Sequence, residues 1–162
     1  MTQRSEKHFA MDGMLGKLAK WLRILGFDAR CEQLKEQHQI DAYRSHGFWV
    51  VTRNRRWSGQ SGVYCLAAND PLEQLREMVH QIPVTPHEIR LLQRCIRCNG
   101  PIEKMTREDA FGSVPDFVYE THTSFHRCPA CGKIYWPGTH AKRIRERLQT
   151  EFGWHISEDF RE

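Results

Sequence analysis

The sequence carries two short cysteine motifs, Cys95-Ile96-Arg97-Cys98-Asn99-Gly100 and Cys128-Pro129-Ala130-Cys131-Gly132. Two Cys-x-x-Cys motifs in one chain are typical of a tetrahedral zinc site, because each short loop places two thiolates on one side of the metal. The glycine that closely follows each motif permits a tight turn, which directs backbone N–H groups at sulfur. The spacer between the motifs is longer than in a compact zinc finger, so we expect it to fold back as a hairpin. Two disulfides or four unrelated thiols are the alternative, but the regular pairing favours a structural Zn²⁺ held by all four cysteines.

Length and composition limit the classes of protein that the chain can belong to. It has 162 residues, 40 % of them hydrophobic, which is enough for one full domain or two small ones. No apolar run approaches the length of a membrane span, and the polar segment from Met1 to His8 lacks the apolar centre of a signal peptide. Six cysteines without a secretion signal predict a cytoplasmic protein, with Cys31 and Cys65 as buried free thiols. The net charge of +4 is too mild to establish nucleic-acid binding by itself.

Strand-like and helix-like segments alternate in the first half of the chain. Apolar residues recur at helical spacing from Met14 to Leu25, and the continuous apolar run 48–51 suits a central parallel strand. The predicted strands are 8–11, 27–31, 48–51 and 63–67, followed around the second cysteine motif by 125–128 and 133–136, and the predicted helices of the first half are 14–25, 32–45 and 71–82. This alternation predicts an α/β fold with a mainly parallel sheet.

The segment Pro83–Pro86 interrupts this pattern and predicts a domain boundary. We therefore expect an α/β domain over residues 1–86 and a zinc ribbon with a basic C-terminal helix over residues 87–150. Residues 151–162 are expected to form a loosely held tail.

Three polar residues lie at or just beyond the predicted carboxyl ends of strands: Asp12, Asn54 and Asp70. In open α/β sheets ligands bind at this edge, so these residues are expected to converge there. Oxygen ligands at one edge can hold Mg²⁺ or Mn²⁺, and such an ion can activate water and stabilise charge on a phosphate. The alternative is that Asp12 and Asp70 are simply helix N-caps, although one carboxylate can serve both purposes.

Basic residues cluster near the same edge and in the C-terminal helix. The candidates for contact with a nucleic-acid backbone are Lys17, Lys20, Arg53, Arg55, Arg56, His140 and Arg143. For the lysines on the first helix, a solvated helix face is the alternative. Because four thiolates complete a tetrahedral site, His122, His126 and His140 are interpreted as surface or RNA-contacting residues and not as zinc ligands.

Several of these stretches match the pattern of a known family. They are Asp12-Gly13-Met14-Leu15-Gly16-Lys17-Leu18-Ala19-Lys20-Trp21-Leu22-Arg23, the strand end Thr52-Arg53, the knuckle Cys95/Cys98-Asn99, and Cys128-Pro129-Ala130-Cys131-Gly132-Lys133-Ile134-Tyr135-Trp136-Pro137-Gly138-Thr139-His140. In these residues the chain resembles the Mut-seven C-terminal RNase family, a PIN-like nuclease domain fused to a zinc ribbon. The resemblance covers about residues 8 to 145.

The resemblance implies a PIN-like fold, an acidic site for Mg²⁺ or Mn²⁺ and ribonuclease activity. Carried over by position, the four acidic positions of the family are Asp12, Glu36 (with Asp41 as the alternative), Asn54 and Asp70. Asn54 stands where the family has its third acid. An amide offers a neutral oxygen, so this departure removes a negative charge from a site whose affinity depends on charge.

Three functions follow from these patterns. The first is a metal-dependent endoribonuclease whose zinc ribbon and basic helix bind RNA or a ribonucleoprotein. The second is an RNA- or ribosome-binding protein without catalysis, which Asn54 favours. The third is a zinc-ribbon adaptor that docks proteins through the apolar pair Tyr135-Trp136. The sequence does not predict the oligomeric state.

Overall fold

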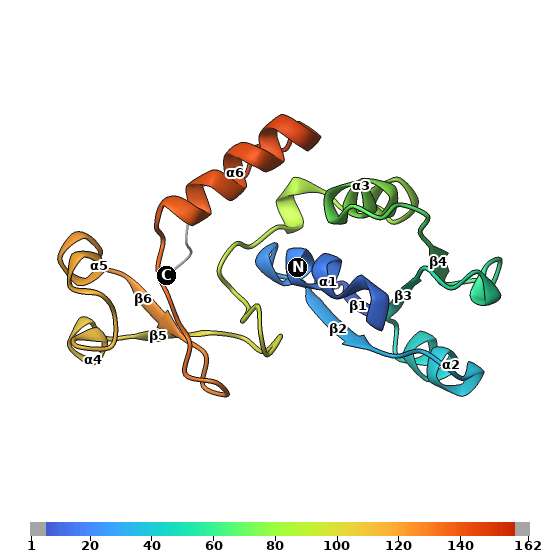
Figure 1. Ribbon diagram of the computed structural model, residues 1–162, viewed down its shortest axis with the longest axis horizontal. Coiled ribbons are helices and arrows are strands. Elements are labelled where there is room, and N and C mark those ends of the chain that lie inside the picture. The colour runs from blue at the N-terminus through green and yellow to red at the C-terminus, as the bar shows by residue number, and fades with distance from the viewer. Residues whose placement is uncertain (1–5, 158–162) are drawn as a thin grey trace, which may run out of the picture. The chain divides into compact units, whose positions relative to one another are not determined.

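The computed structural model describes residues 6–157, which form two compact units (Figure 1). The first unit comprises residues 6–23 and 27–84, and the second comprises residues 24–26 and 85–157. Each unit has its own sheet.

The first unit is built on a four-stranded sheet in the order β2-β1-β3-β4, in which all neighbouring strands are parallel. Its strands are β1 (His8–Asp12), β2 (Asp28–Glu32), β3 (Trp49–Thr52) and β4 (Val63–Cys65). The predicted parallel α/β fold is therefore confirmed, and the apolar run before Thr52 forms one of the two central strands. Since all four strands run the same way, their carboxyl ends meet at one edge of the sheet.

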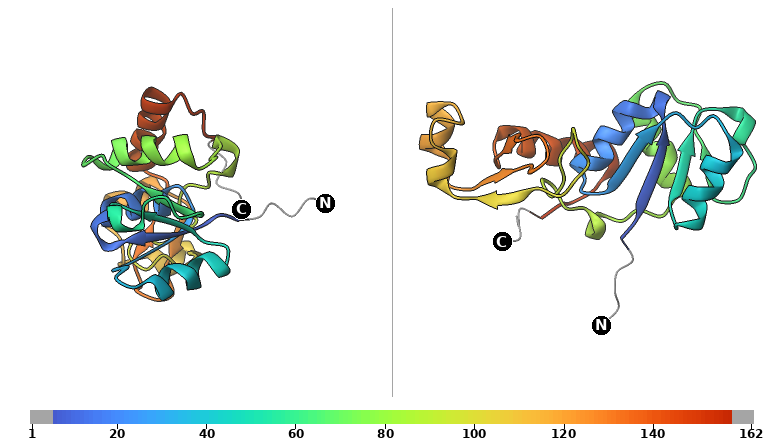
Figure 2. Two further views of the ribbon diagram at one scale, coloured as in Figure 1. Left: turned by 90° about the vertical axis from the view of Figure 1, so that its right-hand side faces the viewer. Right: turned by 90° about the horizontal axis from the view of Figure 1, so that it is seen from below.

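Helices cover both faces of this sheet. They are η1 (Gly13–Leu15), α1 (Gly16–Ile24), α2 (Gln37–Ser45), η2 (Arg55–Trp57) and α3 (Pro71–Gln81). The step from β1 to β2 and the step from β2 to β3 cross the sheet in opposite directions. Because parallel crossovers are right-handed, these steps place α1 and α2 on opposite faces. Figure 1 and the left view of Figure 2 show α2 and α3 on opposite sides of the strands.

The face of the sheet that α2 covers also carries the first acidic position. Ala10 of β1 packs in a buried cluster with Val50 of β3 and Ile40 of α2. Side chains two residues apart on a strand share a face, so Asp12 lies on the same side of β1 as Ala10. The core thus fixes the direction in which the Asp12 side chain leaves the strand.

Several details of the first unit differ from the sequence-based expectation. The predicted strand 63–67, for example, ends at Cys65 as β4. The predicted helix over 32–45 begins only at Gln37, because Glu36 and Gln39 form a reciprocal capping box that starts α2 there. The thiols of Cys31 and Cys65 are free, as predicted, but they are half-buried and not fully buried.

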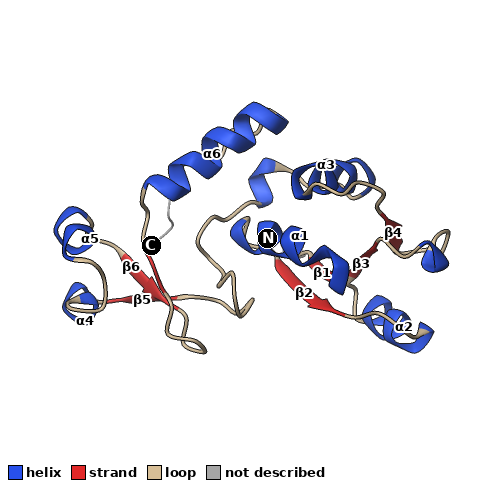
Figure 3. Cartoon of the chain, in the orientation of Figure 1, coloured by secondary structure: helices blue, strands red, loops and turns tan. Residues whose placement is uncertain are grey.

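The second unit contains a three-stranded antiparallel sheet in the order β5-β6-β7. Its elements are η3 (Pro86–Glu88), β5 (Glu103–Met105), α4 (Arg107–Ala110), α5 (Asp116–Thr121), β6 (Phe125–Arg127), β7 (Ile134–Tyr135) and α6 (Thr139–Phe152). The spacer between the cysteine motifs does fold back through the β5–β6 pair. However, it also carries the short helices α4 and α5, which the sequence did not predict; they come between β5 and β6 in the chain, and Figure 3 shows them at one end of this strand pair.

The last helix, α6, ends at Phe152, two residues beyond the expected end of the basic helix. Gly153 follows with φ +67°, the left-handed conformation that commonly terminates a helix. Residues 158–162 of the predicted tail lie outside the described part of the chain. No helix among residues 6–157 is both long enough and apolar enough to span a membrane.

Candidate functional site

Asp12 ends β1 at the carboxyl edge of the parallel sheet, and its side chain is held there by three hydrogen bonds. Oδ1 accepts from the backbone N–H of Gly13 at 2.7 Å and from that of Leu34 at 3.4 Å. Oδ2 accepts from the hydroxyl of Thr52 at 2.8 Å. The residue is only 8 % exposed, and donors of the protein hold its carboxylate. Asp12 is also the N-cap of η1, as the alternative interpretation predicted.

Thr52 connects Asp12 to Asn54. Its fully buried hydroxyl donates to the Asp12 carboxylate and accepts from the backbone N–H of Asn54 at 2.9 Å. Asp12 and Asn54 line one pocket together with Lys35 and Gln33. The Asn54 amide oxygen accepts from the backbone N–H of Arg56 at 3.1 Å and caps η2. The structure therefore brings together the first and third acidic positions of the family pattern.

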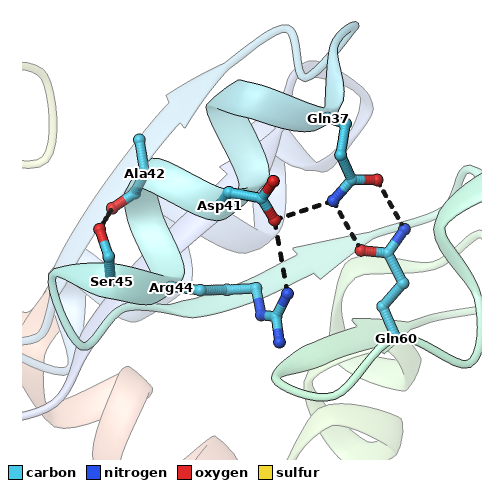
Figure 4. Close-up of polar contacts among 6 residues, drawn as sticks. All are labelled: Gln37, Asp41, Ala42, Arg44, Ser45 and Gln60. Atoms are coloured by element: carbon cyan, nitrogen blue, oxygen red, sulfur yellow. Dashed lines mark hydrogen bonds and ion pairs between the residues drawn. The ribbon is translucent and has the colours of Figure 1, made fainter.

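The remaining acidic positions do not line this pocket. Glu36 is exposed at the N-cap of α2. Asp41 lies on α2, where it accepts from Gln37 at 2.9 Å and from Arg44 at 3.5 Å, and the Gln37 side chain pairs with Gln60 (Figure 4).

Asp70 is exposed and caps α3, where its Oδ1 accepts from the backbone N–H groups of Leu72 and Glu73. Within residues 6–157, Asp12 belongs to no group of three or more His, Cys, Asp or Glu side chains close enough to hold one ion.

The basic side chains of the first unit that are predicted to contact a nucleic-acid backbone differ in their surroundings. Lys17, Lys20 and Arg55 are exposed. Arg56 is also exposed, but its guanidinium lies over the Trp57 ring, 4.6 Å from the ring centre. Arg53 donates to Ala67 O at 3.3 Å and to Asn69 Oδ1 at 2.6 Å. Its guanidinium therefore holds the loop between β4 and α3, which ends at Asp70. In the second unit, His140 and Arg143 are exposed on α6.

The two cysteine motifs have matching backbone geometry. In the first, the N–H of Asn99 donates to Cys95 O at 2.8 Å, and in the second, the N–H of Gly132 donates to Cys128 O at the same distance. Both residues have positive φ, +63° for Asn99 and +74° for Gly132. The sequence predicted that the glycine after the first motif makes the tight turn. In the structure the left-handed residue of this motif is Asn99. Asparagine tolerates this conformation better than most residues.

The four sulfurs converge on one point. The Sγ atoms of Cys95, Cys98, Cys128 and Cys131 all lie within 4.8 Å of one another. The Sγ atoms of Cys95 and Cys131 are 3.8 Å apart, and a tetrahedral zinc site with Zn–S bonds of about 2.3 Å requires sulfur separations of about 3.8 Å. Among the described residues this is the one group of its kind, and it can hold a metal ion such as zinc.

Tyr135 contacts the first cysteine directly. Its buried hydroxyl accepts from the backbone N–H of Ile96 at 3.1 Å and lies 3.1 Å from Cys95 Sγ. The Tyr135 hydroxyl oxygen accepts from the Ile96 N–H, so the hydroxyl proton is free to be donated to the Cys95 sulfur. Burial raises the pKa of Tyr135, and the contact with Cys95 raises it further, so the hydroxyl keeps its proton. Tyr135 therefore orients Cys95, a candidate metal ligand, and its buried side chain does not form an exposed docking surface.

The four sulfurs do not ionise independently of one another. Burial opposes ionisation of Cys95, but hydrogen bonds from the Tyr135 hydroxyl and from backbone N–H groups lower its pKa to about 6. The hydrogen bond to Cys131 raises the pKa of Cys98. Four adjacent sulfurs cannot all ionise without a compensating positive charge, which a divalent metal supplies.

The sequence did not identify Lys35 as a lining residue of the Asp12 pocket. It also did not identify two partners, Thr52 as the partner of Asp12 and Tyr135 as the partner of Cys95. Each pair is separated by 40 positions in the chain. The sequence predicted that Thr52 and Arg53 lie at a strand end. It did not predict which residue Thr52 contacts. No local signal could have revealed the contact of Tyr135 with Cys95.

The protein thus combines a parallel α/β unit, which has a fixed aspartate at the carboxyl edge of its sheet, with a second unit in which four cysteines could hold a metal ion. The family model of the Mut7-C RNAse domain matches residues 7–148, and the chain belongs to this family. The family indicates a nuclease-like function with RNA as substrate or partner. Comparison with curated proteins and with solved structures gave no match.

Proposed function

We propose that the chain is a ribonuclease that hydrolyses RNA phosphodiester bonds at the pocket of Asp12 and Asn54. The observation that carries the proposal is the Mut7-C RNAse match over residues 7–148, which includes this pocket. The position of Asp12 supports it, because ligands of open α/β sheets bind at the carboxyl ends of the strands.

A catalytic Mg²⁺ or Mn²⁺ is part of the proposal. Asp12 offers a carboxylate and Asn54 an amide oxygen to the same pocket. Mg²⁺ is commonly bound through one or two carboxylates, with waters and substrate phosphate completing its shell, so this pair fits a weak site. An ion bound there would polarise the phosphodiester and lower the pKa of water. Glu36 and Asp70 are the other acidic positions of the family pattern. They do not line the pocket, but they remain candidate catalytic residues.

The chain's own residues have defined tasks in this proposal. Thr52 fixes the orientation of the Asp12 carboxylate through its buried hydroxyl. Lys35 lines the pocket, and with the exposed Arg55 and Arg56 it supplies positive charge for the RNA phosphates. Arg53 acts indirectly, because its guanidinium holds the loop that ends at Asp70.

The second unit is proposed to hold a structural Zn²⁺ at its four cysteines and to bind RNA or a ribonucleoprotein. The sulfur geometry supports zinc, since the separations suit a closed tetrahedral site. The exposed His140 and Arg143 on α6 support contact with phosphates.

A second candidate is an RNA-binding protein without catalysis. Two observations favour it: Asn54 replaces an acid of the family pattern, and within residues 6–157 Asp12 has no cluster of further carboxylates around it. A site with one fewer negative charge binds a divalent cation more weakly.

One experiment separates the two candidates. Labelled single-stranded and structured RNAs are incubated with the zinc-loaded chain, with and without Mg²⁺ or Mn²⁺, and binding is followed in parallel as a function of salt. The ribonuclease proposal predicts cleavage that requires the added ion and binding that weakens steeply with salt. Binding with this salt dependence but without cleavage, on every RNA and with both ions, would support the second candidate instead.

A further inference from the structure

The second unit contains a hollow of about 330 Å³ that is lined by none of the four cysteines and by none of the residues of the Asp12 pocket. Its walls come mainly from residues 91–96, 133–136 and 138–144, which surround the start of α6. This volume lies at the lower end of the range for small-molecule sites.

Aromatic and aliphatic side chains form most of the wall. Leu91, Ile96 and Ile144 contribute aliphatic surface, and Trp136 contributes an aromatic ring. The Trp136 ring lies against Gly138, because a Cβ atom at that position would be 3.2 Å from two atoms of the indole. The indole is therefore directly beside the backbone at which α6 begins.

The charge of the lining has one sign. Arg94, Lys133 and His140 line the hollow, and no aspartate or glutamate does so among its described lining residues. The Lys133 ammonium lies 5.3 Å from the centre of the Tyr135 ring, and Arg94 donates to Asn99 O at 2.6 Å. An anionic ligand would therefore meet basic groups and no opposing carboxylate.

The start of α6 adds backbone donors to this lining. The helix has 14 residues, its N-cap Gly138 makes no side-chain cap, and its first turn contains no acid. The first backbone bond into the helix runs from Lys142 N to Gly138 O at 3.4 Å. The preceding N–H groups at the positive end of the helix are oriented to receive an anion.

We propose that this hollow binds one unstacked nucleotide of single-stranded RNA. The base lies against Trp136 in the apolar part, and its phosphate lies at the N-terminus of α6. A nucleotide combines the two properties that the hollow matches, a planar aromatic body and an adjacent anion, and stacking on an aromatic side chain tolerates any base. The inference rests on RNA as the substrate or partner of the proposed function, but it does not depend on cleavage.

The test uses the zinc-loaded full chain without added Mg²⁺ or Mn²⁺, titrated by calorimetry with adenosine 5′-monophosphate, adenosine and inorganic phosphate. The monophosphate should bind at least about tenfold more tightly than either part alone, because only it reaches both the indole and the helix end. Equal binding of inorganic phosphate would mean a plain anion site and would overturn the inference, as would the lack of monophosphate binding at millimolar concentration.

Two matched variants locate the phosphate. Thr139→Glu places a carboxylate in the exposed first turn of α6, which favours the helix but repels an anion, so the affinity for the monophosphate should fall about fivefold without a lower melting temperature. Gln149→Glu adds the same charge near the exposed other end of α6 and should leave that affinity unchanged. Equal affinities in the two variants would contradict the placement of the phosphate.

The indole has its own test. Trp136→Leu should weaken the binding of both adenosine and its monophosphate while the zinc content stays the same, and unchanged binding of both would remove the base from the hollow. The proposed function is measured separately by RNA cleavage. Cleavage without monophosphate binding refutes this inference alone, and monophosphate binding without cleavage refutes the ribonuclease alone.

Discussion

Replacing Tyr135 with Phe removes one hydroxyl and leaves the ring in place. That hydroxyl lies 3.1 Å from Cys95 Sγ and accepts from Ile96 N, also at 3.1 Å. Phe keeps the buried aromatic surface, so the change isolates the two hydrogen bonds. The account predicts weaker zinc binding and an easier loss of zinc in acid.

The magnitude follows from the two contacts. A hydrogen bond to a charged group contributes about 1.5–3 kcal/mol, which corresponds to a loss of about 10- to 100-fold in zinc affinity. The hydroxyl is among the groups that lower the pKa of Cys95 to about 6, so without it that pKa rises. Protons then displace the metal at a higher pH. If two to four protons compete with one zinc ion, the midpoint of release moves up by about 0.3–1 pH unit.

The assay is chelator competition with the zinc-loaded chain across a pH series. Tyr119→Phe is the matched control, since Tyr119 lies in the same unit and packs on Phe125 without contact to a sulfur. Zinc affinity in the control should equal that of the natural chain. If Tyr135→Phe held zinc as tightly as Tyr119→Phe at every pH, the hydroxyl would have no part in the metal site.

Three further predictions concern the remaining sites. Thr52→Val should lower RNA cleavage by at least about tenfold, because Asp12 loses the donor that orients it and active sites tolerate little displacement. Cys98→Ser should abolish stoichiometric zinc and unfold the second unit, as seen by metal analysis and circular dichroism, because metal binding supplies much of the folding free energy of such units. Replacing Arg55 and Arg56 with Ala should reduce the slope of log affinity for RNA against log salt by about 1.4, for two lost phosphate contacts.

Each of these predictions has a control. Thr52→Ser keeps the hydroxyl and should keep most of the cleavage, so equal losses in Val and Ser would count against the Asp12 contact. Cys65→Ser changes a free thiol outside the cluster, and zinc content should respond to Cys98 but not to Cys65. Lysine at positions 55 and 56 keeps the charge, and an unchanged slope in the alanine variant would mean that these arginines do not face the RNA.

The parallel sheet was predictable because β1, β3 and β4 are short, mainly apolar runs bounded by turns, and because apolar residues recur at helical spacing from Met14 to Leu25. The start of α2 was missed, although its signal is local. Glu36 and Gln39 form a capping box, in which the Gln39 side chain accepts from the backbone N–H of Glu36 at 2.9 Å. The polar segment before it contains too few apolar residues to show where helical periodicity begins.

The helices inserted between the cysteine motifs escaped prediction for a different reason. α4 has four residues and α5 has six, which is less than two turns, so no apolar periodicity can develop. Tertiary contacts stabilise them, since Ala110, Val114 and Phe125 form one buried cluster.

The site was predictable only where its residues follow a local pattern. The four cysteines are such a case, because Cys-x-x-Cys fixes the loop geometry by itself. The pairing of Thr52 with Asp12 and of Tyr135 with Cys95 depends on strand register and on the fold of the second unit. Asp70 was correctly placed at a helix N-cap, but its position after an edge strand does not bring it to the pocket of Asp12.

The most direct test of the proposed ribonuclease compares cleavage of one labelled RNA by the natural chain, Asp12→Asn and Asn54→Asp, with Mn²⁺ or Mg²⁺ present. The account predicts slow cleavage by the natural chain, none by Asp12→Asn, and faster cleavage by Asn54→Asp, because the added carboxylate restores a charge to the pocket. Cleavage that is the same in the natural chain and in Asp12→Asn would contradict the account, because the pocket would then not be where the RNA is cut.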